Sequence, residues 1–236
     1  MIMKKIYPVL MIVLSFVLFN CGNNSSESNQ NFSNSSEDIV ENESETAVNN
    51  ISENSGTFTD ARDGHTYKWV KIGNQIWMAE NLNYETSDGS WCYDNNSNNC
   101  NDYGRLYDWE TAKKVAPEGW HLPSRDEFNT LINFIGGETN ESALKLKSKS
   151  GGWLENGNGY DSYGFNAKSV GYYHLQERFC CIGISTHFWS SDGYYSNEDD
   201  EYNGYCLSIY YDSSKLGAYL TENAKNGFPV RLIKDY

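Results

Sequence analysis

Basic residues are scarce in this 236-residue chain. Its 18 Lys and Arg stand against 32 Asp and Glu, which gives a formal net charge of −14 at pH 7. An acidic protein repels the phosphate backbone of DNA and RNA. We therefore expect no nucleic-acid partner.

Long hydrophobic runs are absent except near the start of the chain. The run Ile6–Phe19 has 14 residues, too few to span a bilayer comfortably but the right length for a signal-peptide core. Lys4 and Lys5 precede it and Cys21 follows, an order that resembles a bacterial lipoprotein signal, in which the cysteine becomes the lipidated first residue. We expect residues 1–20 to be a signal peptide and Cys21 to carry a lipid anchor. The alternative, an uncleaved N-terminal anchor, would also attach the protein to the membrane. The expected location is the bacterial cell envelope, at the outer membrane or the cell surface.

Lys and Arg are missing altogether from residues 22–56, which hold nine Asn, nine Ser and seven acidic residues. Such a segment buries too little apolar surface to offset its ordering entropy. We expect residues 21–56 to be a disordered tether that holds a domain off the membrane. Residues 57–236, with 16 basic and 25 acidic side chains and hence a net charge of −9, then form one domain large enough to bury a core.

The chain has six cysteines, five of which remain once Cys21 is set aside. In an exported protein, disulfides are more common than metal sites. Cys92 and Cys100 bracket a short polar loop, so we expect a local bridge between them. We expect Cys206 to pair with Cys180 or Cys181, and favour the Cys181–Cys206 bridge. A zinc site formed by Cys180, Cys181, Cys206 and His187 is disfavoured, because adjacent cysteines do not match the usual ligand spacing.

The stretch Tyr107–Leu131 predicts two helices joined by a corner. Ser124 and Glu127 form a capping box, and apolar residues follow at helical spacing, which predicts a helix over 125–135. A shorter helix is expected from Asp108, which can cap its N-terminus, to Ala116, where Pro117 ends it.

The rest of the domain predicts short strands and long loops. Strands are expected near residues 57–60, 65–72, 75–78, 164–167, 171–175, 188–190, 205–211, 218–221 and 229–233. Gly73-Asn74 predicts a hairpin turn between the second and third of them. A loop is expected over 81–100 and a short helix over 142–147. We assign Trp77, Trp109, Trp120 and Trp189 to the core. Together these elements indicate an α+β fold.

Several motifs in a fixed order resemble one protein family. The sequences YGRLYDWETA, GWHLPSRDEFNTL, GFNA, FWSS and PVRLIKD are similar, in that order, to the Fibrobacter major paralogous domain family, over most of residues 57–236. The resemblance implies a C-type-lectin-like domain, with two short helices packed on short antiparallel strands and long loops. The formylglycine-generating enzymes resemble the same fold. At Ala116 and Leu232 this chain departs from two cysteines often seen in the family, which implies that a disulfide between those positions is missing here.

Patterns typical of catalysis are not apparent. The chain has four His, contains no G-x-S-x-G motif, and offers no third group to orient a pair such as Cys181 and His187. We also find no counterpart of the copper-binding cysteine pair that the resemblance to the formylglycine-generating enzymes would suggest. We therefore predict no catalytic residues, and keep an enzyme of that kind as an alternative.

The sequence instead favours a binding module. Tyrosine is abundant, with 18 residues, and neighbouring pairs of Tyr in a strand place one ring on each face. The acidic run NEDDEYNG (197–204) follows one such pair and could offer oxygen atoms to calcium, although it does not fit the EF-hand pattern. We predict ligand contacts in the loops between Gly183 and Tyr205, at Tyr194, Tyr195, Asp199, Asp200, Glu201 and Asn203. The expected ligand is a glycan or a surface protein, no cofactor is expected apart from possible calcium, and a purely structural surface protein is the further alternative.

Overall fold

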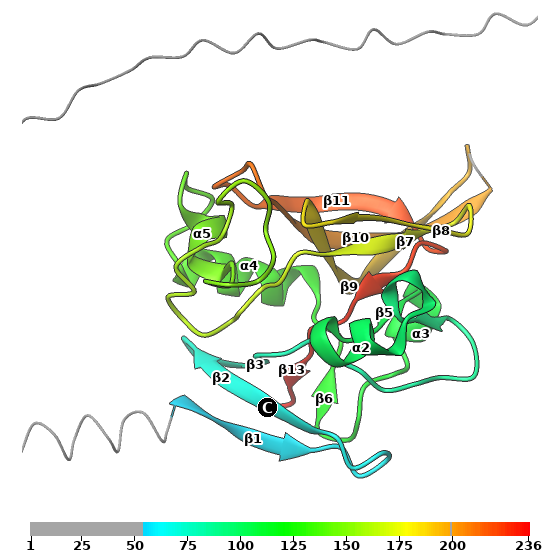
Figure 1. Cartoon of the computed structure of the whole chain (residues 1–236), viewed down its shortest axis with the longest axis horizontal. Coiled ribbons are helices and arrows are strands. Elements are labelled where there is room, and N and C mark those ends of the chain that lie inside the picture. Colours follow the sequence, from blue (N-terminus) through cyan, green and yellow to red (C-terminus); the bar gives the residue numbers. More distant parts are fainter. Residues whose placement is uncertain (1–53, 199) are drawn as a thin grey trace, which may run out of the picture. The chain divides into compact units, whose positions relative to one another are not determined.

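The computed structural model describes residues 54–236 with the exception of residue 199 (Figure 1). The expected signal peptide, Cys21 and most of the expected tether therefore lie outside the described residues. The first strand begins at Ser55, inside the range expected for the tether.

Short strands and helices alternate along the described chain. Their order is β1 (Ser55–Thr59), β2 (Thr66–Ile72), β3 (Gln75–Met78), β4 (Ser90–Trp91), η1 (Tyr93–Asn95), α2 (Ser97–Tyr103), β5 (Leu106–Tyr107), α3 (Trp109–Ala112), β6 (Trp120–His121), α4 (Arg125–Phe134), α5 (Ser142–Leu146), β7 (Val170–His174), β8 (Arg178–Ile182), β9 (Ser185–Ser196), β10 (Glu201–Tyr210), β11 (Gly217–Asn223), β12 (Phe228–Pro229) and β13 (Ile233–Lys234). Strands pair antiparallel within every sheet of this part of the chain. The expected α+β class, with short antiparallel strands and short helices, is confirmed.

A five-stranded sheet joins the two ends of the described chain. Its strand order is β1-β2-β3-β13-β6. Gly73, which has a positive φ of 62°, and Asn74 form the expected turn between β2 and β3. Ile233 of β13 pairs with Trp77 on one side and with His121 on the other. The C-terminal strand therefore lies inside this sheet.

A three-stranded sheet of order β11-β10-β9 carries the predicted ligand-binding segment. Its strands lie together at the upper side of the domain in Figure 1. The segment 183–205 was expected to be mainly loop, but β9 and β10 are long strands that pair from Ser185–Tyr210 out to Ser196–Glu201. The sequence did not predict the full length of these strands, because their polar and glycine-rich outer part lacks the apolar alternation by which strands are usually detected.

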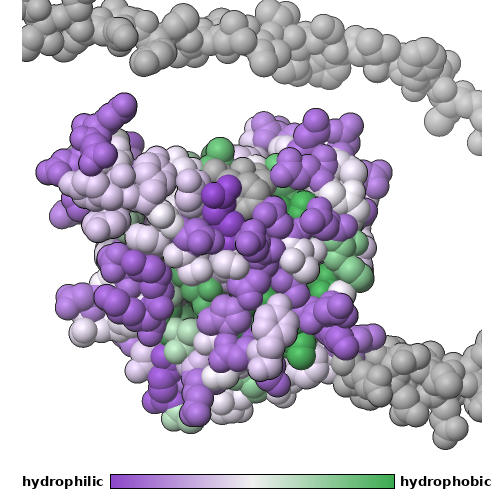
Figure 2. All heavy atoms as spheres, turned by 180° about the vertical axis from the view of Figure 1, so that it is seen from behind, coloured by the Kyte–Doolittle hydropathy of each residue, from purple (hydrophilic) through white to green (hydrophobic). Residues whose placement is uncertain are grey.

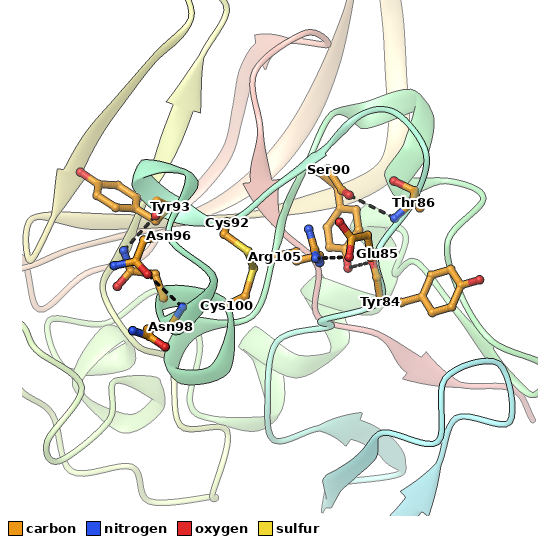
Figure 3. The surroundings of a disulfide bond; sticks show 12 residues. Tyr84, Glu85, Thr86, Ser90, Cys92, Tyr93, Asn96, Asn98, Cys100 and Arg105 are labelled. Atoms are coloured by element: carbon orange, nitrogen blue, oxygen red, sulfur yellow. Dashed lines mark hydrogen bonds and ion pairs between the residues drawn. A yellow bond between two sulfur atoms is a disulfide. The ribbon is translucent and has the colours of Figure 1, made fainter.

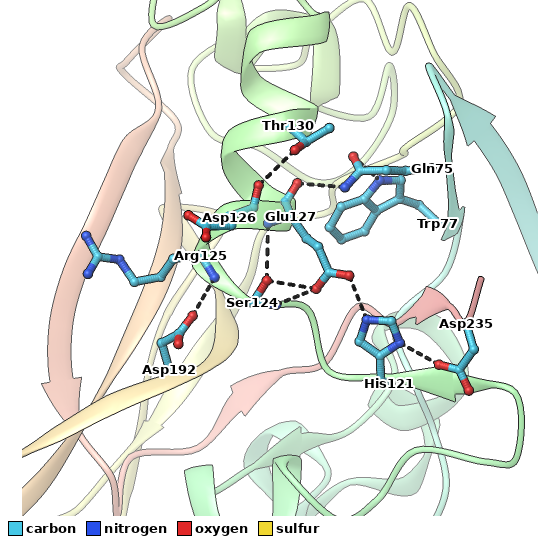
Figure 4. A network of polar contacts seen from close by, with 10 residues as sticks. All are labelled: Gln75, Trp77, His121, Ser124, Arg125, Asp126, Glu127, Thr130, Asp192 and Asp235. Carbon is cyan, nitrogen blue, oxygen red and sulfur yellow. Dashed lines mark hydrogen bonds and ion pairs between the residues drawn. The ribbon is translucent and has the colours of Figure 1, made fainter.

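Helix α4 agrees with the sequence prediction. The Ser124 hydroxyl accepts a hydrogen bond from the Glu127 amide, and the Glu127 carboxylate accepts one from the Ser124 amide at 2.8 Å (Figure 4). Phe128, Leu131 and Ile132 form its buried face. Gly136 and Gly137, both with positive φ, follow the last turn and end the helix.

Helix α3 is shorter than the expected range 108–116. Asp108 caps it as predicted, accepting from the Thr111 amide at 2.8 Å, but the helix ends at Ala112. Lys113 and Lys114 continue as a turn, in which the Lys114 amide donates to the Thr111 carbonyl at 2.9 Å, a spacing of three residues instead of the four of an α-helix.

The expected loop 81–100 is interrupted by β4 and η1, and helix α2 begins within it. Asn96 caps it by accepting from the Asn98 amide, and the Cys92–Cys100 disulfide joins it to the end of β4 (Figure 3). The polar sequence of α2 buries only Cys100, so it offered no apolar periodicity to detect. The expected strand at 164–167 is reduced to one isolated bridge, between Ala167 and Lys147.

Two hydrophobic clusters form most of the core. One surrounds Trp77 and Phe128, whose rings stack at 5.3 Å, and packs α4 and α5 against β9 and β10. The other contains Trp109, Trp120 and Trp189. All four tryptophans assigned to the core are buried, as predicted.

Candidate functional site

The predicted ligand-binding residues lie at the outer end of the β9–β10 hairpin. Tyr194 and Tyr195 are 42% and 43% exposed, and Asp200 is also exposed. Glu201 and Asn203 are partly exposed, and Asp199 lies outside the described residues. The side chains that the structure describes are therefore accessible to a ligand.

The hairpin has two aromatic faces. Tyr195 pairs directly with Tyr202, their ring centroids 5.1 Å apart and edge to face. Tyr194 lies on the opposite face, with its ring 5.8 Å from that of Tyr205, which in turn packs under the guanidinium of Arg125 at 4.1 Å. Alternation along the strands thus divides the predicted set between two surfaces.

A groove opens on the Tyr202 side of the hairpin. It has a volume of about 870 Å³ and is lined by Trp91, Asp108, Trp109, Glu110, Lys113, Asp200, Glu201, Tyr202, Asn223, Ala224 and Lys225. These residues come from β4, from α3 with its cap, from the start of β10 and from the end of β11. We call this the hairpin groove. Of the predicted residues, it includes Asp200 and Glu201.

Backbone hydrogen bonds fix the elements that form the groove. The Trp109 amide donates to the Ala224 carbonyl at 2.9 Å, and the Ala224 amide donates to the Tyr202 carbonyl at 3.0 Å. The Trp109 indole also donates to the Ser190 carbonyl at 2.8 Å. Helix α3, β9 and the ends of β10 and β11 are therefore tied together before any ligand arrives.

Charged pairs hold the acidic side chains of the hairpin groove in place. Lys225 lies 2.6 Å from a carboxylate oxygen of Glu201, and Asn223 donates a second hydrogen bond to that carboxylate. These contacts lower the pKa of Glu201. Hydrogen bonding from Lys113, at 2.7 Å, outweighs partial burial and lowers the pKa of Glu110. Both carboxylates are ionised at neutral pH.

The Lys113 ammonium group also lies 3.7 Å from the centre of the Trp109 ring, a cation–π contact. One cation thus contacts both the Glu110 carboxylate and the indole at the base of the groove. The side chain has little freedom to move toward a negatively charged ligand.

The outer surface of the domain is mainly polar on the face drawn in Figure 2. Hydrophilic side chains predominate there, and hydrophobic ones show in small separate areas between them. Large continuous apolar patches are what mark many protein–protein interfaces. This face offers only small ones.

The cysteine pairing differs in part from the expectation. Cys92 and Cys100 form the predicted bridge, with their Cα atoms 5.0 Å apart. Cys181, however, is bonded to its neighbour Cys180, and Cys206 is a free, buried thiol. The predicted Cys181–Cys206 bridge is wrong, because Cys206 lies in the middle strand of the three-stranded sheet whereas the other two cysteines lie in β8, in a separate sheet.

The histidines take part in structural contacts. His187 is buried and bonded to the Ser208 hydroxyl at 2.7 Å, and burial lowers its pKa to about 4. Its suggested partner Cys181 is in the disulfide. His121 bridges Glu127 at 2.8 Å and Asp235 at 2.6 Å (Figure 4). Among residues 54–198 and 200–236, no three His, Cys, Asp or Glu side chains gather as a metal site would require.

Sequence analysis missed most of the residues that line the hairpin groove. Trp91, Asp108, Glu110, Asn223 and Lys225 come from segments far apart in the chain, and only the fold brings them together. Of these residues, Asp108 was identified from the sequence, but as a helix cap and not as a residue that lines a groove.

No helix within the described residues has the length and apolar character needed to cross a bilayer. A sequence model of the family described as the Fibrobacter succinogenes major domain matches residues 70–234, a range that includes every residue lining the hairpin groove. No curated protein and no solved structure matches the chain.

Proposed function

Since the chain belongs to the Fibrobacter succinogenes major domain family, we propose that it is a cell-envelope lipoprotein whose family domain binds a glycan or protein ligand and catalyses no reaction. Cys21 carries the lipid, residues 22–54 form the tether that ends where β1 begins, and the anchor places the domain at the outer membrane or the cell surface. The domain has a C-type-lectin-like fold, a proposal supported by its short antiparallel strands, its capped helix α4 and its internal C-terminal strand.

The hairpin groove is the observation that carries the binding function. It combines a concave surface, accessible aromatic rings and ionised carboxylates held by lysine partners. Ligand sites typically have this composition, with a few fixed polar groups among apolar ones. The groove is also formed largely by backbone-bonded elements, so little conformational entropy is lost on binding.

A binding screen with the full-length protein tests this function. The lipoprotein in detergent is applied to a glycan array and, separately, to solubilised envelope proteins, each with calcium and with a chelator. We expect a ligand that the Glu201→Ala/Tyr202→Ala variant does not retain. Retention by that variant would place the site elsewhere, and an empty result in both screens would favour a structural surface protein.

The anchor has its own test. Cells grown with labelled palmitate should incorporate the label into the wild-type chain but not into a Cys21→Ser variant, and the variant should leave the membrane fraction. Labelling of the variant at the wild-type level would exclude Cys21 as the lipid-bearing residue.

A further inference from the structure

Two aromatic rings of the hairpin groove are held in fixed orientations. Trp91 stacks on Tyr173 at 4.3 Å with an angle of 22° between the rings, so one face of its indole is already covered. Tyr202 is 56% exposed and its ring is held edge to face by Tyr195. Rings fixed in this way can stack on an apolar face of a ligand without losing rotational freedom.

Hydrogen-bond acceptors line the groove together with these rings. Glu110 and Glu201 are each fixed by a lysine, and Asp108 is fixed by the Thr111 amide. Each carboxylate oxygen has two lone pairs, so one hydrogen bond or ion pair leaves capacity for another. A ligand with several hydroxyl groups at its edge can therefore donate to these carboxylates.

The charge of the groove restricts the ligand further. Four carboxylates line it, at Asp108, Glu110, Asp200 and Glu201, against the two ammonium groups of Lys113 and Lys225. Both lysines are already paired with carboxylates. A ligand that carries carboxylate or sulfate would meet excess negative charge and find no free cation in the lining.

The size of the groove favours a small ligand over a folded protein. Protein interfaces use about 20–30 residues on each side. The eleven residues that line this groove, and its volume of about 870 Å³, instead match the range of small-molecule sites.

From these observations we propose that the hairpin groove binds an uncharged or amino-bearing oligosaccharide and discriminates against acidic ones. Its pyranose rings stack on Tyr202 and Trp91, and its hydroxyl or ammonium groups donate to Glu110 and Glu201. This inference rests on the proposed binding function and narrows its ligand to one chemical class.

Oligosaccharides that differ in charge test whether the groove discriminates against acidic ligands. Calorimetric titration of the full-length lipoprotein in detergent uses cellotetraose, mannotetraose and the glucosamine tetramer, together with the tetramers of glucuronate and mannuronate. We expect at least one of the first three to bind, and the corresponding uronate to bind about tenfold more weakly or not at all. In the Glu110→Gln/Glu201→Gln variant, the affinities for the uronate tetramer and for its neutral counterpart should lie closer together.

Matched variants locate the site. Tyr202→Ala should weaken binding about tenfold, whereas Tyr202→Phe, which keeps the ring, should bind nearly as well as wild type. Tyr194→Ala removes another exposed ring, which lies on the opposite face of the hairpin outside the groove, and should have no effect. Circular dichroism of each variant checks that the fold is intact.

Three results would overturn the proposal. Uronate tetramers could bind as tightly as their neutral counterparts, Tyr194→Ala could weaken binding as much as Tyr202→Ala, or no neutral or amino tetramer could bind. If no such tetramer binds but an envelope protein is retained through the groove, the binding function stands and only the sugar assignment fails.

Discussion

Gly193 lies directly opposite Gly204 in the β9–β10 pair, and a side chain at either position would collide with the Trp109 indole. A Cβ atom would lie 2.4 Å from the ring at Gly193 and 2.7 Å from it at Gly204. The two glycines thus let α3 approach the hairpin closely enough to form the groove. Neither has a left-handed backbone, so space is the reason for glycine at both positions.

We expect Gly204→Ala to destabilise the domain by about 1–3 kcal/mol, because the buried indole has no room to move. Urea unfolding measures this loss. Ser191→Ala, at an exposed position of the neighbouring strand β9, is the control and should change the free energy of unfolding by less than about 0.5 kcal/mol. Equal stability of the two variants would contradict the collision.

The two disulfides should differ in their effect on stability. The Cys92–Cys100 bridge closes a loop with a sequence separation of 8, so replacing both cysteines by serine should cost about 2–3 kcal/mol in the chain-entropy account. The Cys180–Cys181 bridge joins neighbours and constrains almost none of the unfolded chain. Replacing Cys180 and Cys181 by serine should therefore lower the free energy of unfolding by much less. The urea concentrations at which the two variants are half unfolded measure these losses of stability. Equal losses would show that loop closure does not account for the effect of the Cys92–Cys100 bridge.

His121 predicts a pH dependence of stability. Partial burial disfavours its charged form, but the hydrogen bonds that its ring donates to the Glu127 and Asp235 carboxylates outweigh this and raise its pKa. A raised folded-state pKa means that the contribution is complete below the unfolded-state value of about 6.5 and disappears as the pH rises through the higher folded-state value. The free energy of unfolding should fall over that interval. His121→Gln should abolish this fall, and an unchanged profile in the variant would assign it to another group.

Arg231 should be essential to the core. It is buried and donates to the Asn81 side chain at 2.8 Å and to the Met78 and Phe165 carbonyls. Burial lowers its pKa to about 9, which still leaves it charged at neutral pH. Arg231→Met would leave these acceptors without a donor and should cost about 3 kcal/mol or more.

The matched substitution is Arg231→Lys, which keeps the charge but lacks the fork that reaches several acceptors at once. Its stability should fall between wild type and Arg231→Met in thermal unfolding. A methionine variant as stable as wild type would show that the hydrogen bonds contribute little.

Local chemistry in the sequence predicted the elements that depend on nearby residues. Helix α4 was predictable because its cap, its apolar stripe and its glycine stop all lie within 14 residues of one another, from Ser124 to Gly137. The turn at Gly73 and the bridge between Cys92 and Cys100 are local in the same sense. The buried tryptophans followed from side-chain size alone.

Features that depend on tertiary contacts were not predictable. The partner of Cys181 depended on which sheet Cys206 occupies, and adjacency in the chain gave no indication of a bond to Cys180. The length of β9 came from pairing with β10 rather than from its polar sequence. At the candidate site, the exposed tyrosines could be anticipated, but their division between two faces and the opposing wall from α3 and β11 could not.

The position of β13 has a consequence for the order of biogenesis. Its residues Ile233–Lys234 supply the strand between β3 and β6, so β3 and β6 cannot join one sheet until these residues have been synthesised. During synthesis the sheet therefore stays open until residues 233–234 are available, and a premature stop before Ile233 would leave two unpaired strand edges for proteases to recognise. Tyr236 lies just beyond this closing strand and is 92% exposed, so residues added after it would leave the finished sheet undisturbed.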